Sequence, residues 1–244
     1  KTLAKLSLWD STGTAIARRS RPNDRVDAGH YMALATQRVE DWLALTLREV
    51  ASRADIGSII PVSHGAGVVV IRQQQLACPP LDYAQEIPAA IRTAYNPLRD
   101  AFADTGSPAL PTGLNLGAQL HWQLACDPSL KDRIAHVVTY PQYWGFRLSG
   151  ALATDMSSLG CHTDLWRPCE GRFSDLPGRL GLEGKIAPPR RATEVLGPIS
   201  AEIAHRTGLP ADTQVVCGIH DSNASLLPHL LGRAGPVSVV STGT

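Results

Sequence analysis

Two short segments near the end of the sequence contain residue types that could transfer a phosphoryl group. In Gly218-Ile-His-Asp-Ser-Asn-Ala224 a single carboxylate, Asp221, lies in a turn of small residues after an apolar run that predicts a strand. One hydrophobic run later, a second predicted strand leads into Ser241-Thr-Gly-Thr244, and such a turn can bind phosphate through backbone N–H groups. A base beside one strand and a phosphate site at the end of the next would suit phosphoryl transfer.

The position of Asp221 alone leaves two interpretations open. As a general base, its carboxylate would accept the proton of an alcohol that attacks phosphorus. An Asp before Ser-Asn-Ala-Ser would equally suit the N-terminal cap of a helix. The two interpretations are compatible, because a helix start holds a carboxylate rigidly.

Composition excludes several classes of protein. The chain has 244 residues, 43% of them hydrophobic, and a net charge of +1, which gives no electrostatic reason to expect a nucleic-acid or membrane partner. No apolar run approaches the roughly 20 residues that span a bilayer. The five cysteines are irregularly spaced without a C-x-x-C pair, which is typical of free thiols in a cytoplasmic protein.

The elements that must position these residues follow from hydrophobic periodicity. Residues 3–9 alternate around Leu6 and Leu8, and residues 14–20 return after a glycine turn, which predicts a hairpin. From Thr36 the period becomes that of a helix with one apolar face. Further strands are predicted at 56–63, 68–71, 213–218 and 236–241, and further helices at 87–103 (broken at Pro97), 116–125, 199–207 and 222–231. This alternation predicts an α/β fold in one domain over residues 1–244.

Several segments, in order along the chain, resemble the FGGY family of carbohydrate kinases, which belongs to the actin, hexokinase and heat-shock chaperone superfamily. Besides the two segments above, which resemble G-x-x-D-x-x-A and S-x-G-T, five others do so. They are Lys1-Thr-Leu-Ala-Lys5, Ile59-Ile-Pro-Val-Ser-His-Gly-Ala-Gly67, Gly117-Ala-Gln-Leu-His-Trp122, Tyr143 to Ser158 with its Leu-Ser-Gly and Thr-Asp-Met-Ser, and Leu196 to Val216.

The resemblance implies a fold and an activity. It implies a ribonuclease-H-like domain with a central mixed sheet, in which the strands at 213–218 and 236–241 are neighbours. It implies ATP-dependent phosphorylation of a sugar, a ketose or related polyol, with Mg²⁺ as a cofactor. Asp221 would be the general base, while Thr2, Gly243 and Thr244 would bind phosphate.

Sugar-binding residues are implied at four places. His64 and Gly65 follow a buried strand in a turn of small residues, and His220 and Asn223 flank the expected base; each could equally make hydrogen bonds within the protein. Asp82 and Tyr83 lie near an aromatic and D-x-R pattern of the family, although Gln85 and Glu86 offer no Arg, which puts the substrate class in doubt. Asn115 and Gln119 lie near a further sugar position, with Gln119 where the family usually has Lys.

The resemblance ends before the family's second, nucleotide-binding lobe. The sequence also begins after the Mg²⁺-associated acidic residue of the first phosphate loop. We therefore expect a sugar-binding half-site whose partner is the missing lobe of the same protein, with an apolar surface facing it. A homodimer stays an open alternative.

Two other functions remain open on the sequence: another ATPase of the same superfamily, and a sugar-binding or regulatory domain without catalysis. Cys161-His-Thr-Asp164 with Cys169 resembles a metal cluster at first sight. The adjacent Cys161 and His162 cannot both point inward from a regular element. We therefore expect no metal bound by protein side chains.

Overall fold

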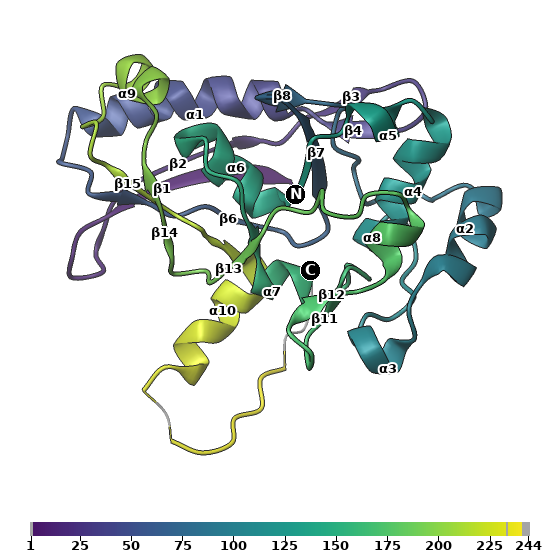
Figure 1. The fold of residues 1–244 in the computed structure, drawn as a ribbon. Coiled ribbons are helices and arrows are strands. Elements are labelled where there is room, and N and C mark those ends of the chain that lie inside the picture. Colours follow the sequence, from purple (N-terminus) through teal and green to yellow (C-terminus); the bar gives the residue numbers. More distant parts are fainter. Residues whose placement is uncertain (1, 233, 241–244) are drawn as a thin grey trace.

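The computed structural model describes residues 2–232 and 234–240, which form a mixed α/β structure (Figure 1). The strands are β1 Leu3–Trp9, β2 Ala15–Pro22, β3 Arg25–Asp27, β4 Met32–Leu34, β5 Ser58–Ile59, β6 Val62–Ser63, β7 Val68–Arg72, β8 Gln75–Leu76, β9 His136–Thr139, β10 Thr154–Asp155, β11 Trp166–Arg167, β12 Arg172–Phe173, β13 Pro189–Arg190, β14 Val195–Pro198, β15 Gln214–Val216 and β16 Ile219–His220.

Helices connect and cover these strands. They are α1 Thr36–Ala51, α2 Ala89–Tyr95, the 3-10 turn Asn96–Leu98, α3 Phe102–Thr105, α4 Leu116–Cys126, α5 Leu130–Arg133, α6 Tyr140–Ser149, α7 Met156–Leu159, α8 Leu176–Arg179, α9 Ala201–Thr207 and α10 Asp221–Leu230. The expected helices are all present, and the break at Pro97 falls in the 3-10 turn. Gly150 and Gly208 end α6 and α9 with left-handed φ of 80° and 73°.

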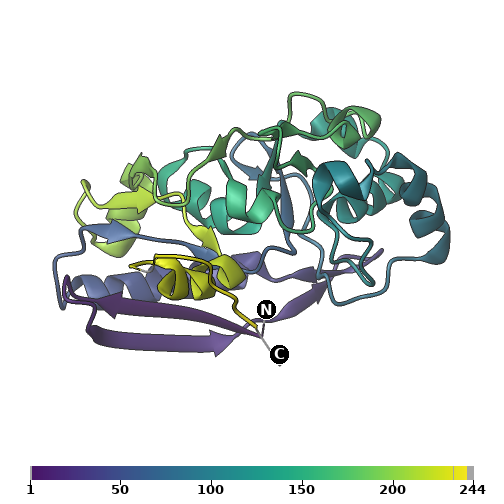
Figure 2. The ribbon, with the colours of Figure 1, turned by 90° about the horizontal axis from the view of Figure 1, so that it is seen from below.

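The β1–β2 hairpin and α1 form as their periodicity predicts. The hairpin is antiparallel, with Leu3 opposite Pro22 and Trp9 opposite Ala15. Leu6 and Leu8 point to one side and pack against a core cluster that includes Leu47 of α1. Figure 2 shows the hairpin along the outer edge of the molecule with α1 beside it.

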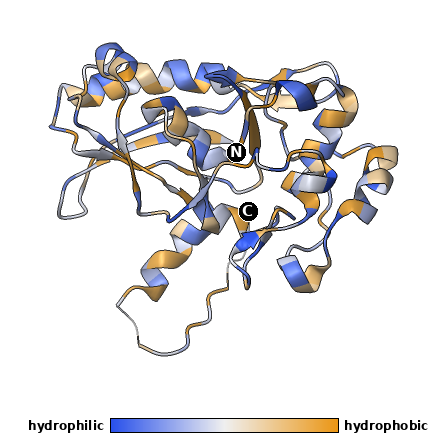
Figure 3. Ribbon diagram, in the orientation of Figure 1, coloured by the Kyte–Doolittle hydropathy of each residue, from blue (hydrophilic) through white to orange (hydrophobic). Residues whose placement is uncertain are grey.

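Strand β7 lies between two core clusters, with Val68 and Val70 in one and Val69 and Ile71 in the other. Its residues Val68 to Ile71 have exposed fractions of 1% or less, because β8 and β9 flank the strand and α4 and α6 contact it. The strand therefore lacks an alternating pattern, as expected for a strand that is covered on both faces. Figure 3 shows it as a continuous hydrophobic segment inside the molecule.

The expected α/β class is confirmed, whereas the strand pairings of the described residues form several small sheets of two or three strands and not one continuous central sheet. Pro61 and Gly218 explain why one of these ladders is divided into two. Strands β5 and β6 run parallel to β15 and β16, and both ladders are interrupted where Pro61 lies opposite Gly218. Pro61 has no N–H to donate, and Gly218 adopts φ of 83°.

The strand that we expected at 236–241 is also wrong as far as the structure describes it. Residues 236–240 have no strand pairing and do not lie next to β15 in a sheet, and residue 241 is outside the described part. Val239 and Val240 have exposed fractions of 42% and 83%. Their β-branched sequence predicts a strand, but here the segment has no neighbouring strand with which to pair.

Helix α10 extends away from the body of the molecule, at the lower part of Figure 1. Each of its residues is described, and none of them is buried. It begins directly at the end of β16. The end of β16 and the first turn of α10 therefore hold His220, Asp221 and Asn223 at the junction between the core and an exposed helix.

Candidate functional site

Asp221 is the first residue of α10. Its side chain is 52% exposed, and its Oδ1 accepts a hydrogen bond from the backbone N–H of Ser222 at 2.7 Å. The N-cap position belongs to His220 and has no side-chain capping bond, so the alternative that Asp221 caps the helix is wrong. The carboxylate still lies at the positive end of the helix dipole, which attracts anionic groups.

His220 lies beside this carboxylate in a buried position. Its ring Nε2 is 3.3 Å from Asp221 Oδ1, and its Nδ1 is 2.8 Å from Asn223 Oδ1. The residue as a whole is 5% exposed. Both ring nitrogens of His220 and the amide oxygen of Asn223 thus make contacts within the protein.

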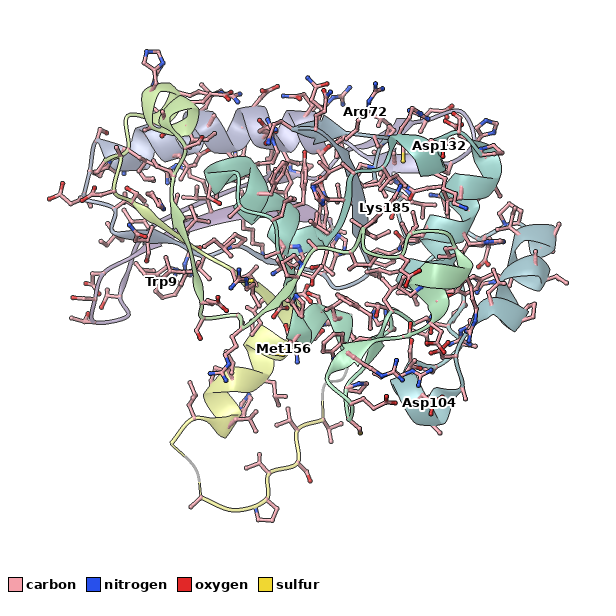
Figure 4. The ribbon with its side chains drawn as sticks, in the orientation of Figure 1. Trp9, Arg72, Asp104, Asp132, Met156 and Lys185 are labelled. Carbon is pink, nitrogen blue, oxygen red and sulfur yellow. The ribbon has the colours of Figure 1, made fainter. Side chains whose placement is uncertain are left out.

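The Thr154-Asp-Met-Ser157 segment fixes the backbone of His220 through a hydrogen bond. Asp155 is 1% exposed, and its carboxylate accepts hydrogen bonds from the backbone N–H groups of Ser157 and Ser158 and from the Ser157 hydroxyl. Ser157 Oγ in turn accepts a hydrogen bond from the backbone N–H of His220 at 3.1 Å. Figure 4 shows Met156, which is 43% exposed, close to the beginning of α10.

His64 lies one residue beyond the pairing of β6 with β16, in which Ser63 is opposite His220. Its ring is stacked on Tyr140 at a centroid distance of 4.8 Å and meets Tyr83 edge-on at 5.1 Å. The two glycines that follow allow close packing. A Cβ on Gly65 would lie 2.8 Å from His220 Nε2, and one on Gly67 would lie 2.8 Å from the Tyr140 Cβ.

Asp82 and Tyr83 enter the same region from the segment after β8. The Asp82 side chain is fully buried and forms an ion pair with Arg25 of β3 at 3.3 Å. Burial is the main cause that raises the pKa of Tyr83, with smaller contributions from the negative charges of Asp82 and Asp221. Tyr83 is therefore close enough to both carboxylates to sense their charge.

Gln119 of α4 connects two of these loops. It is 0% exposed, and its Nε2 donates to the carbonyl oxygens of Ala66 at 3.0 Å and Gly113 at 2.5 Å. The backbone N–H of Gly113 donates to the Tyr83 carbonyl. Asn115, also buried, bonds to Ser107, Leu110 and other loop atoms. In the structure, the side chains of Gln119 and Asn115 therefore hold loops in place through hydrogen bonds.

The structure brings His64, Gly65, Tyr83, His220, Asp221 and Asn223 into one region through the contacts above. Asp82 belongs to the same region, because its negative charge contributes to the raised pKa of Tyr83. A surface hollow of about 500 Å³ near Asp175 and Arg179 is lined by none of these residues, so the expected site does not coincide with it.

Sequence reasoning missed several residues of this region. His162 has its ring centroid 6.4 Å from that of His220, and burial is the main cause that lowers its pKa. Its only signal in the sequence is the Cys161–Cys169 segment, which resembles a metal cluster rather than part of a sugar site. Nothing in the sequence points to Tyr140 or Ser157. Tyr140 stacks on His64 and Ser157 accepts from the His220 backbone only because the fold brings these segments together.

Of the residues expected to bind phosphate, Thr2 is exposed next to β1, where its carbonyl oxygen accepts from the Asn23 N–H. Gly243 and Thr244 lie outside the described residues. Within residues 2–232 and 234–240, no group of three or more His, Cys, Asp or Glu residues could hold a metal ion. No helix in that part is both long and apolar enough to cross a membrane.

Comparison with known proteins shows which of them this chain is similar to. No family model and no curated protein matches the sequence. Among solved structures, a carbohydrate kinase from Novosphingobium aromaticivorans is 43% identical, with a TM-score of 0.88 over 93% of this chain and 49% of its own.

More distant structures share the fold. A xylulose kinase from Rhodospirillum rubrum is 22% identical with a TM-score of 0.83, over 95% of this chain and 50% of its own. A glycerol kinase from Plasmodium falciparum, solved with ADP, is 10% identical with a TM-score of 0.78, over 94% and 48%. The chain thus spans about half the length of these structures, and it belongs to the FGGY family of carbohydrate kinases.

Proposed function

We propose that the protein containing this chain transfers the γ-phosphate of ATP to a hydroxyl of a ketose or related polyol. The observation that carries the proposal is the position of Asp221, a half-exposed carboxylate at a helix start next to His220 and near Tyr83, whose ring contacts His64. The 43% identity to a carbohydrate kinase supports this reaction class.

In this mechanism Asp221 accepts the proton of the attacking hydroxyl. Little other covalent chemistry is required of a protein that catalyses phosphoryl transfer, because orientation and charge stabilisation supply most of the rate. The carboxylate suits this role because the Ser222 N–H and the helix dipole hold one of its oxygens. Its exposed part would face the sugar.

The sugar would lie against the residues that surround Asp221. The hydroxyl of Tyr83 is protonated at neutral pH, as in any tyrosine, and it can therefore donate to a sugar oxygen. His64, Gly65 and Asp82 complete the proposed binding region, and His220 and Asn223 border it. The ion pair between the exposed Arg25 and the buried Asp82 would fix the orientation of the segment that contains Tyr83.

ATP with Mg²⁺ would supply the phosphoryl group and neutralise its charge. The exposed position of Thr2 fits a hydroxyl donor to phosphate, and Gly243 and Thr244 would add backbone donors. A second lobe of the same protein would close the site, consistent with solved relatives about twice as long as this chain. We place the protein in the cytoplasm, with a homodimer as a further possible assembly.

Replacing Asp221 by Asn tests the proposal in the complete protein. Asn keeps the shape but cannot accept the proton, so kcat should fall by about 10²–10⁴-fold, while sugar affinity measured by calorimetry stays nearly unchanged. Asp212→Asn, in the exposed loop before β15, is the matched control and should leave kcat unchanged. Normal turnover of Asp221→Asn would remove Asp221 from the mechanism.

A screen of ketoses, aldoses and polyols with ATP would identify the acceptor. We expect phosphorylation of a ketose or polyol by the complete protein and no kinase activity from residues 1–244 alone. Strong ATP-dependent activity of this half would contradict the two-lobe proposal.

A further inference from the structure

The backbone and the side chain of His220 are both held by contacts, although the residue is next to an exposed helix. Its backbone N–H donates to Ser157 Oγ, its Nδ1 faces Asn223 Oδ1 at 2.8 Å, and its Nε2 faces Asp221 Oδ1 at 3.3 Å. Three different elements, α7, β16 and α10, thus determine where this ring lies.

Gly65 packs directly against the ring of His220. A Cβ at this position would lie 2.8 to 3.1 Å from three ring atoms of His220, which is closer than carbon atoms normally approach. Gly65 has no left-handed φ that would by itself require glycine. The close approach of the ring therefore accounts for a glycine here, and it restricts movement of the ring on that side.

The contacts of the two ring nitrogens limit the possible protonation states. A charged ring would donate from Nδ1 to Asn223 Oδ1 and would carry a second proton on Nε2, which is 3.3 Å from Asp221 Oδ1. A neutral ring protonated at Nε2 would keep that second proton, with the Asn223 amide turned so that its NH₂ group donates to Nδ1. A neutral ring protonated at Nδ1 would instead direct a lone pair toward the carboxylate, which is unfavourable while Asp221 is ionised.

Three other ionisable groups near Asp221 or His220 carry no charge at neutral pH. Burial is the main cause that raises the pKa values of Tyr83 and of the Cys161 thiol, and each is raised further by the charge of Asp221. Burial lowers the pKa of His162, which keeps its ring neutral as well. His220, which faces the carboxylate directly, is thus the neighbour best placed to stabilise its charge.

We propose that His220 is a positioning residue, which donates a hydrogen bond from Nε2 to Asp221 and thereby fixes the carboxylate that accepts the sugar proton. Asn223 and Gly65 hold the ring in the orientation that this bond requires. The inference rests on the proposed function, and it gives His220 and Asn223 a role other than direct contact with the sugar. His220 forms no covalent bond in this proposal, and the proton of the sugar hydroxyl still goes to Asp221.

The test compares His220→Phe and His220→Gln in the complete protein, with His121→Gln on α4 as the control for loss of a partly buried histidine. Phe keeps a ring but has no donor, so kcat should fall about 10- to 100-fold, while the sugar Kd changes less than about threefold. Gln keeps an N–H donor and should restore part of the loss. His121→Gln should leave kcat unchanged.

The pH profile separates positioning from a purely structural effect. A hydrogen bond to the charged form of a carboxylate favours that form. The acidic limb of kcat/KM should therefore move to higher pH in His220→Phe. An unchanged limb with unchanged kcat, or a loss confined to sugar affinity, would overturn the proposal.

Two further variants keep the test informative if His220→Phe does not fold. Asn223→Leu removes the partner of Nδ1, and Gly65→Ala pushes against the ring, so both should lower kcat more than sugar affinity. In a protein with ¹⁵N-labelled histidine, Asp221→Asn should shift the Nε2 resonance of His220, and no shift would contradict the bond. Normal turnover of Asp221→Asn would instead contradict the proposed function.

Discussion

Single side chains hold the loops of the proposed site, and Gln119 is the clearest example. Its amide donates to the carbonyl oxygens of Ala66, in the turn after His64, and of Gly113, whose own N–H donates to the Tyr83 carbonyl. Gln119→Leu should lower the free energy of unfolding by about 1–3 kcal/mol, because two buried carbonyls lose a donor. The same change should weaken sugar binding about tenfold, since the loops are no longer connected.

Gln123, one turn later on α4, is the matched control. It is equally buried and donates to the Pro79 carbonyl and to the Tyr31 hydroxyl. Gln123→Leu should cost similar stability in urea unfolding but leave the sugar Kd unchanged by calorimetry. Equal losses of affinity in both variants would mean that Gln119 acts on stability alone.

At this scale, residue type and spacing predicted where chemistry could occur but not how it is supported. Asp221 and His64 stand out because a carboxylate and an imidazole follow predicted strands in turns of small residues. Ser157 and Tyr140 do not stand out, because their contacts with His220 and His64 join segments more than 60 residues apart in sequence. Only the tertiary structure brings such partners together.

The junction between β15 and β16 gives a prediction at the scale of elements. Gly218 has φ of 83°, and a Cβ on it would lie 2.1 Å from the Pro61 carbonyl oxygen. Gly218→Ala should therefore destabilise the protein by more than about 3 kcal/mol, or prevent folding, because conformational strain and a clash with backbone add together.

Gly208 separates these two effects. It has φ of 73° at the end of α9, but a Cβ there would meet no atom within 4 Å. Gly208→Ala should cost only about 1–2 kcal/mol in urea unfolding. If both alanine variants lose the same stability, the contact with Pro61 has no energetic consequence.

The periodic elements were predictable, and the sheet connections were not. The helix from Thr36 and the hairpin from residue 3 follow from spacing alone, because each repeats its pattern over many residues. The segment 236–240 has the composition of a strand but no partner strand, and β-propensity reflects packing against neighbours. The interruption at Pro61 and Gly218 likewise depends on which residue lies opposite which.

The tyrosines give a prediction for the whole molecule. Burial is the main cause that raises the pKa of all five, and that of Tyr143 is raised to about 12. In the unfolded chain these hydroxyls ionise near pH ~10. Above that pH the unfolded state loses protons that the folded state keeps, so stability that is fully present below pH ~10 is lost as pH rises.

Urea unfolding between pH ~8 and pH ~11 measures this effect, and tyrosinate absorbance of the folded protein provides the control. The slope should approach about 1.4 kcal/mol per pH unit for each tyrosine that is ionised only in the unfolded chain. Ionisation of the folded protein near pH ~10, as in free tyrosine, would contradict the buried hydroxyls.

Helix α10 also makes the protein suitable for spectroscopic labelling. Ser225 and Leu227 are exposed on this helix, one turn beyond the proposed base. Among the five cysteines, Cys169 is the exposed one, so Cys169→Ser together with Ser225→Cys would leave one readily labelled thiol. A fluorophore at that thiol would report, in real time and without a coupled assay, when the environment of the helix changes as sugar or ATP is added.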